Sequence, residues 1–379
     1  MGIERIPDKL STNNITDGSV TKGKFSKKIV HYNAGAPTKT NDTGEGYATG
    51  TLWIDTTNGD MYVCTDHTAE NSGWVNMEGD DVNVSTAWQG LTYGYELGGD
   101  NPGPQVDKIT RFAFAAPYPS SDVGELAQAM QAMGVGYNSG TGFTAGGLEG
   151  PSTYIAEVTS FPTSASSSVT VTDKGDLNTG GWAYGTSGWS PTKGYTFGGQ
   201  DDGPNVDTIQ DYAFSAPFSS SDVSEVAAAK DFQGASDSPT HTFITNGYPA
   251  VNNIYYYQKD TTNDASDIGE VTQTKYDTSS STDNVNGYGF VCAGADPVVD
   301  TISRYAHTSS APSSDVGELS ANGAYGADRG APSLTHGHFS YRVSGPASSL
   351  QRHAFSSPYA GADISESANA IDYVSMIGV

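Results

Sequence analysis

Residues 120–126 have the sequence SSDVGEL, and five related phrases follow it at intervals of 45 to 51 residues. An Asp at the third position can accept hydrogen bonds from backbone N–H groups two residues on, and Gly can adopt a positive φ. The phrase therefore predicts one structural turn in each of six similar units. The repeated aspartates are Asp122, Asp173, Asp222, Asp267, Asp315 and Asp363.

Two further patterns share this period. An aromatic or apolar run ends in small residues, as in YELGG at 95–99 and YTFGG at 195–199. Apolar and polar residues alternate in ITRFAF at 109–114 and ISRYAH at 302–307, as is typical of β-strands. A unit of about 49 residues holds four short strands, which is the size of one propeller blade. We therefore predict an all-β fold with a six-bladed β-propeller at residues 81–379.

A propeller must also close its ring. We expect residues 368–379 to complete the blade that begins near residues 86–95, because a closed ring leaves no exposed sheet edge. The Gly pairs at 98–99, 146–147 and 198–199 are expected where strands crowd the central channel.

Composition excludes several classes of function. The net charge of −25, with only 18 Lys and Arg residues, argues against nucleic-acid binding. No apolar run reaches membrane-spanning length, so no membrane insertion is expected. Cys64 and Cys292 lie in different predicted modules and are expected to stay unpaired.

The N-terminal part differs from the repeats. Residues 1–31 are predicted to form an extended arm, in which the first 30 residues hold six basic and three acidic side chains. Residues 32–80 are predicted to form a small β module with strands at 51–55 and 61–65 around a turn, then a short strand that ends at Trp74.

These phrases resemble known families. The Gly doublets and aromatics resemble kelch-type β-propellers. SSDVGEL is similar to the Asp-box of sialidase-like propellers, although the aromatic residue that normally follows is missing. Alternating YTFGG and SSDVGEL phrases resemble acidic propeller proteins in virions of marine and cyanobacterial tailed phages. GTLWIDT at 50–56 resembles a module of phage tail fibres. The best Asp-box matches are Ser120, Asp122 and Gly124, and Ser313, Asp315 and Gly317.

Candidate ligand-binding residues are few. Arg111, Arg304 and Arg352 share one register position in their units, and sialidase-like enzymes clamp a carboxylate with three arginines. The alternative, which we favour, is that each Arg pairs with an acidic residue of a neighbouring turn.

No catalytic residue, metal site or cofactor is predicted. GGQDDGPNVD at 198–207 lacks the ligand spacing of a calcium loop and is attributed to turn chemistry. His336 and His338 share a strand face without an evident third metal ligand.

Together these features predict a structural phage virion protein without enzymatic activity, such as a tail fibre, spike or capsid appendage, assembled in the host cytoplasm. Residues 1–80 would bind other virion proteins, and the propeller would recognise a host-surface glycan or protein. We also expect a homo-oligomer. The alternatives are a sialidase-like glycan-cleaving enzyme of the virion and a cellular kelch-type interaction scaffold.

Overall fold

The computed structural model contains two compact units, residues 1–84 and 85–379. It describes residues 30–379 except for 58–59, 70–71, 77–88, 101–103, 165–166, 296, 309, 311–312, 324–328, 343–347 and 367–372. The predicted basic arm therefore lies outside the described residues, apart from its last two positions. Within the described ranges, no helix is long and apolar enough to cross a membrane.

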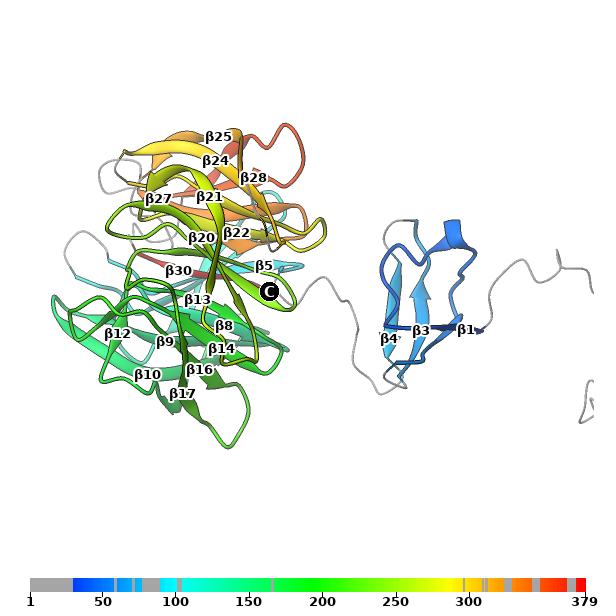
Figure 1. Cartoon of the computed structure of the whole chain (residues 1–379), viewed down its shortest axis with the longest axis horizontal. Helices are drawn as coiled ribbons and strands as arrows, with labels where there is room; N and C mark the ends of the chain where they lie inside the picture. The colour runs from blue at the N-terminus through cyan, green and yellow to red at the C-terminus, as the bar shows by residue number, and fades with distance from the viewer. Residues whose placement is uncertain are drawn as a thin grey trace, which may run out of the picture. The chain divides into compact units, whose positions relative to one another are not determined.

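The first unit holds a four-stranded sheet in the order β1-β2-β3-β4 (Figure 1). A 3₁₀ helix, η3 (Thr43–Glu45), precedes β2, and Asp42 caps it by accepting a hydrogen bond from the Gly44 N–H at 2.6 Å. Tyr47, Trp53 and Trp74 form the centre of the core. The predicted strands at 51–55 and 61–65 are confirmed, the third runs past the predicted end at Trp74 to Asn76, and a parallel strand, β1, is added beside β2. The strands are β1 (Val30–Asn33), β2 (Leu52–Asp55), β3 (Met61–Asp66) and β4 (Gly73–Asn76).

The described part of the second unit is built from six four-stranded antiparallel sheets and a short two-stranded one, so the fold is all-β and propeller-like. The four-stranded sheets are β30-β5-β6-β7 (Ser375–Gly378, Tyr93–Leu97, Lys108–Ala113, Ser120–Glu125), β8 to β11 (Gly134–Asn138, Thr141–Glu149, Thr153–Pro162, Thr172–Asp176), β13-β14-β16-β17 (Thr186–Trp189, Lys193–Phe197, Thr208–Ala213, Ser220–Glu225), β18 to β21 (Gly234–Asp237, His241–Thr245, Val251–Gln258, Ser266–Lys275), β22 to β25 (Ser279–Asp283, Tyr288–Cys292, Val299–Ala306, Ser314–Gly323) and β26 to β29 (Ala331–Pro332, His336–Arg342, Ser348–Ala354, Gly361–Glu366). The short one pairs β12 (Trp182–Ala183) with β15 (Gln200–Asp201).

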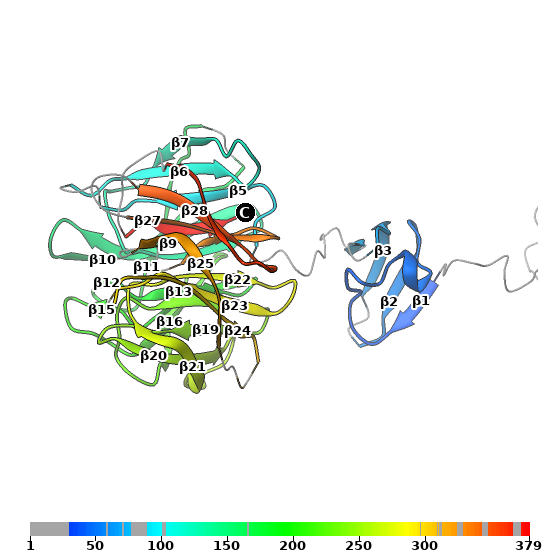
Figure 2. The same cartoon turned by 90° about the horizontal axis from the view of Figure 1, so that it is seen from above.

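The two ends of the second unit meet in one sheet. Strand β30 pairs with β5, and the register places Ser375 opposite Leu97 (Figure 1). The sheet that contains β28 lies beside the one that contains β6 (Figure 2). Phe112, Leu350 and Met376 share one apolar cluster. The predicted pairing of the C-terminal segment with the first sheet is therefore present.

A recurring glycine–aromatic pair stabilises five of the six sheets. In the first sheet, Gly94 lies opposite Phe112, and a Cβ on Gly94 would stand 2.2 Å from the ring. The ring thus covers the glycine and fills the space that a side chain would take. Gly142 with Phe161, Gly194 with Tyr212, Gly289 with Tyr305 and Gly337 with His353 repeat this arrangement.

The SSDVGEL phrases form outermost strands rather than turns, which corrects the sequence prediction. In β7, Ile109 pairs with Gly124 while Thr110 pairs with Asp122, so the residue between them is the extra residue of a β-bulge. The expected local hydrogen bond is present, because the Gly124 N–H donates to Asp122 Oδ1 at 3.1 Å. The same bulge occurs at Asp173, Asp222, Asp267, Asp315 and Asp363.

The bulge glycine leaves a space against which an aromatic residue of the next sheet packs. Gly175 has a φ of +136°, and a Cβ there would lie 2.6 Å from the ring of Phe218, which precedes β17. Tyr359, which precedes β29, lies in the same way against Gly317. Where the bulge residue is glycine, the repeated phrase therefore bends the outer strand and also leaves room for a neighbouring hairpin. In two of the six units this position is a serine, Ser224 or Ser365.

Candidate ligand-binding face

Five inner strands begin after a residue in the left-handed region, which is uncommon for residues other than glycine. These residues are linked in series by their backbones: the Tyr184 N–H donates to Ala132 O at 3.2 Å, and the Phe232 N–H donates to Tyr184 O at 2.6 Å. The bonds offset the cost of the unusual φ. The five residues, with their φ values, are Ala132 (54°), Tyr184 (60°), Phe232 (53°), Asp277 (56°) and Tyr373 (50°).

This backbone series brings three rings together, which we call the aromatic triangle: Tyr184, Phe232 and Tyr373. Their centroids are separated by 4.8 Å (Tyr184 and Phe232), 5.9 Å (Tyr184 and Tyr373) and 6.0 Å (Phe232 and Tyr373). All three rings are half-buried, so part of each ring meets solvent. Partly exposed rings at the junction of several sheets offer apolar surface to a ligand.

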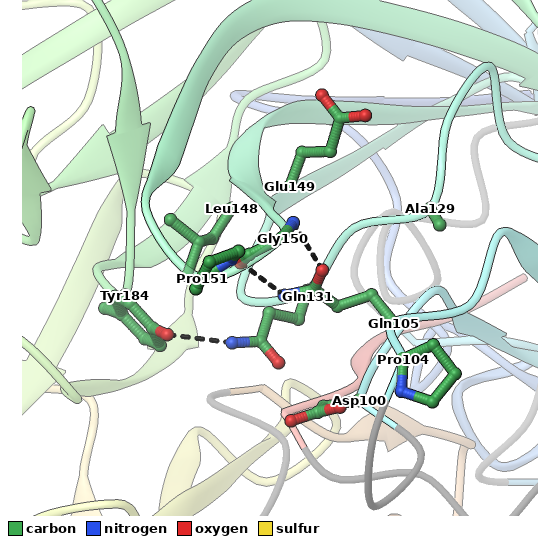
Figure 3. A pocket seen from close by; sticks show the side chains of 10 residues that line it. All are labelled: Asp100, Pro104, Gln105, Ala129, Gln131, Leu148, Glu149, Gly150, Pro151 and Tyr184. Carbon is green, nitrogen blue, oxygen red and sulfur yellow. Dashed lines mark hydrogen bonds between the residues drawn. The ribbon is translucent and has the colours of Figure 1, made fainter.

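A polar hollow of about 560 Å³ adjoins Tyr184. Figure 3 shows Gln131 facing Tyr184, and its Nε2 donates to the Tyr184 Oη at 2.8 Å. Gln105 Nε2 donates to Gly150 O at 2.8 Å and so closes one side of the hollow. Asp100 and Glu149 add carboxylates to the lining. Amide, phenol and carboxylate groups together can both donate and accept hydrogen bonds.

A second hollow of about 380 Å³ adjoins Phe232 and Tyr373. Its carboxylate Asp231 is buried, and burial raises the pKa of that carboxyl above its usual range. Gln200 Nε2 donates to Asp231 Oδ2 at 2.7 Å. The two hollows therefore flank the aromatic triangle and differ in character, because rings are more numerous in the second lining.

The sequence did not single out these residues. The three rings of the aromatic triangle precede strands of three different sheets, and the shared signal is only an aromatic residue shortly before an inner strand. Tyr184 and Phe232 are 48 residues apart, which is close to the period of the repeats. An alignment of the six units on that period would have found both.

The three predicted arginines each stack on a tyrosine ring. The sequence prediction paired them with carboxylates of neighbouring turns, and that pairing stays a prediction; the structure adds a cation–π contact for each arginine, and Arg304 also donates a hydrogen bond to the Tyr359 hydroxyl. The three arginines lie in strands β6, β24 and β28 of three different sheets, and each guanidinium lies over a different tyrosine ring. The pairs are Arg111 over Tyr93 (4.3 Å), Arg304 over Tyr288 (4.4 Å) and Arg352 over Tyr118 (5.0 Å).

The two histidines considered for a metal have other contacts. His338 is buried, its Nδ1 lies 3.1 Å from Ala331 O, and its ring stacks on Phe114 at 4.6 Å. His336 Nδ1 lies 2.8 Å from Thr335 Oγ1. Within the described ranges, no group of three His, Cys, Asp or Glu side chains is arranged to hold a metal ion. Cys64 and Cys292 are both free and buried.

A buried charge cluster lies in the interior of the second unit. Asp237 is fully buried, and its carboxylate contacts Lys259 Nζ at 2.7 Å and Arg329 NH2 at 2.5 Å. Arg329 also donates to Ser187 O at 2.8 Å and stacks on the Trp189 ring at 4.0 Å. These five residues come from three sheets, so the cluster ties inner strands together.

No family model and no curated protein matches the chain. Among solved structures, that of YjhT is similar, with a TM-score of 0.54 and 11% sequence identity. The similarity covers 73% of this chain and 98% of YjhT. At this identity the likeness shows the fold alone, and it supports an all-β, propeller-like arrangement for the second unit.

Proposed function

We propose that the chain is a virion appendage protein whose second unit is a closed six-bladed propeller that binds surface glycans. The six blades are the six four-stranded sheets in the described part of the second unit. Two observations support closure: β30 pairs with β5, and β30 also neighbours β8, the inner strand of the next sheet.

Closure is tested by deleting residues 375–379. Met376 and Ile377 are fully buried, and their loss would expose the edge of β5. We expect the truncated chain to unfold at a clearly lower temperature in a thermal melt followed by circular dichroism. Equal melting temperatures for the truncated and the full chain would contradict closure.

The observation that carries glycan binding is the aromatic triangle between two hollows with polar lining. Sugar rings stack their C–H faces on aromatic rings, and their hydroxyl groups exchange hydrogen bonds with amides and carboxylates. Tyr184 connects the two hollows, because it lines the first hollow and packs on Phe232, which lines the second.

A glycan array probed with the full chain, followed by calorimetry with the best binder, tests this function. Tyr184→Ala should weaken binding about two- to tenfold, since one aromatic contact contributes about 0.5–1.5 kcal/mol. Tyr32→Ala is the matched control, because Tyr32 lies in the first unit and is 65% exposed. Unchanged affinity of a folded Tyr184→Ala variant would remove the triangle from the proposal.

The virion assignment rests on the resemblance of residues 50–56 and of the repeats to phage virion proteins. We expect the fragment 81–379 to stay out of assembled particles and residues 1–80, fused to another protein, to be incorporated. Mass spectrometry of purified particles measures both. Incorporation of the isolated 81–379 fragment would instead make the propeller the docking surface.

The absence of enzymatic activity stays a prediction. Asp100 and Glu149 both line the first hollow, and glycan cleavage generally uses two carboxyl groups. Release of shorter sugars from a bound glycan, lost in Glu149→Gln, would favour the enzyme alternative over a binding protein.

A further inference from the structure

Four aromatic side chains surround the second hollow, which we call the aromatic hollow. Phe232 lies 6.2 Å from Tyr276 and 6.0 Å from Tyr373, measured between ring centroids. Tyr248 meets Tyr276 edge to face at 5.1 Å. The remaining lining residues are Gln200, Asp231 and Asp277. Rings at these distances and tilts form the corner of a cage rather than a stack.

Two carboxyl groups, those of Asp231 and Asp277, line the aromatic hollow. Both residues are 2% exposed, and among the described residues no Lys or Arg belongs to the lining. Asp231 Oδ2 accepts a hydrogen bond from Gln200, whereas Oδ1 has no hydrogen-bond partner in the part of the chain that the structure describes. A buried carboxylate oxygen without a donor is costly, and a cation in the hollow would relieve that cost.

We propose that the aromatic hollow binds a methylated ammonium group, as in choline. Aromatic faces attract cations through the ring quadrupole, and cages of several rings are suited to quaternary ammonium ions, which are weakly hydrated and donate no hydrogen bond. The two buried carboxylates supply the opposite charge and disfavour carboxylated or sulfated ligands at this position. A volume of about 380 Å³ accommodates the small head of such a ligand.

This inference deepens the proposed function and rests on it only for the source of the ligand. A surface glycan that carries phosphocholine would place its sugar on the aromatic triangle and its ammonium group in the aromatic hollow. Phe232 and Tyr373 belong to both places, so one ligand can occupy the two together.

The test is calorimetric titration of the full chain with choline and with 3,3-dimethyl-1-butanol, its uncharged analogue of the same shape. We expect choline to bind at least about tenfold more tightly than the analogue. Tyr248→Ala should weaken choline binding about tenfold. Tyr248 is 49% exposed, so this variant is expected to fold. Asp231→Asn should weaken it as well, and Tyr32→Ala should leave it unchanged.

Equal binding of choline and its analogue, or no binding of choline to the folded chain, would overturn the proposal. Tighter binding of glucosamine than of choline would also overturn it, because a protonated primary amine would then be the preferred cation. Phosphocholine binding at least as tightly as choline indicates a phosphocholine-bearing glycan, and weaker binding indicates free choline. Glycan binding that depends on Tyr184 but not on Tyr248 would leave the proposed function intact while this inference fails.

Discussion

Replacing Asp237 by Asn should be among the most destabilising single changes in the chain. The side chains of Asp237, Lys259 and Arg329 are all at most 3% exposed. The substitution leaves the buried Arg329 and Lys259 without their carboxylate partner, and breaking a buried ion pair in this way costs about 3–5 kcal/mol of unfolding free energy. Arg329 cannot shed its proton, whereas Lys259 can, because burial lowers its pKa to about 8.

This difference between the two cations produces a pH signature. At pH 7 the wild-type Lys259 is protonated and gains from Asp237, while at pH 9 it is mostly neutral. In Asp237→Asn the lysine is expected to be neutral at both values. The stability lost in the variant should therefore shrink by about 1 kcal/mol between pH 7 and pH 9.

Urea unfolding of both proteins at pH 7 and pH 9, followed by tryptophan fluorescence, measures these changes. Glu125→Gln is the control, because Glu125 pairs with Lys108 at the surface, with 63% of its side chain exposed. It should cost less than about 1 kcal/mol. An equally small loss for Asp237→Asn, or a loss independent of pH, would refute the reasoning.

Two further predictions concern stability. Burial lowers the pKa of His307, His338 and His353 to about 3, so the unfolded state takes up protons below about pH 6.5 that the folded state does not. Stability should then fall on acidification by about 1 kcal/mol per pH unit for each His, and His353→Phe should lower the total slope by about 1 kcal/mol per pH unit in urea unfolding at pH 4 to 6. An unchanged slope would contradict this account. Gly175→Ala should lower the unfolding free energy by about 1–3 kcal/mol, because its Cβ meets the Phe218 ring, whereas Gly203→Ala has a similar positive φ in open space and should cost only about 1 kcal/mol. Equal losses of unfolding free energy would show that a side chain at position 175 does not crowd the Phe218 ring.

Repetition made much of the fold predictable. The alternating phrases at 109–114 and 302–307 became β6 and β24, and the runs that end in glycine at 95–99 and 195–199 became β5 and β14. The local hydrogen bond of the repeated Asp was also predictable, because it depends on residues two positions apart. The strand that contains this Asp was mistaken for a turn, since a β-bulge places turn residues inside a strand.

The candidate site was not predictable in the same way. Tyr184, Phe232 and Tyr373 each stand alone in the sequence and meet only because neighbouring sheets set them side by side. The arginines illustrate the converse. Arg111, Arg304 and Arg352 share a register position in the sequence, but a shared register places equivalent residues in different sheets. Each arginine therefore stacks on a different tyrosine.

The sequence by itself determined the period, the strands and the all-β class, because these depend on side-chain alternation and glycine placement within a few residues. Only the tertiary structure decided which side chains converge. Asp237 acquires Lys259 from its own sheet and Arg329 from another, and no local pattern marks the three as partners. Contacts between sheets depend on how the sheets pack, and that packing brings together residues tens of positions apart along the chain.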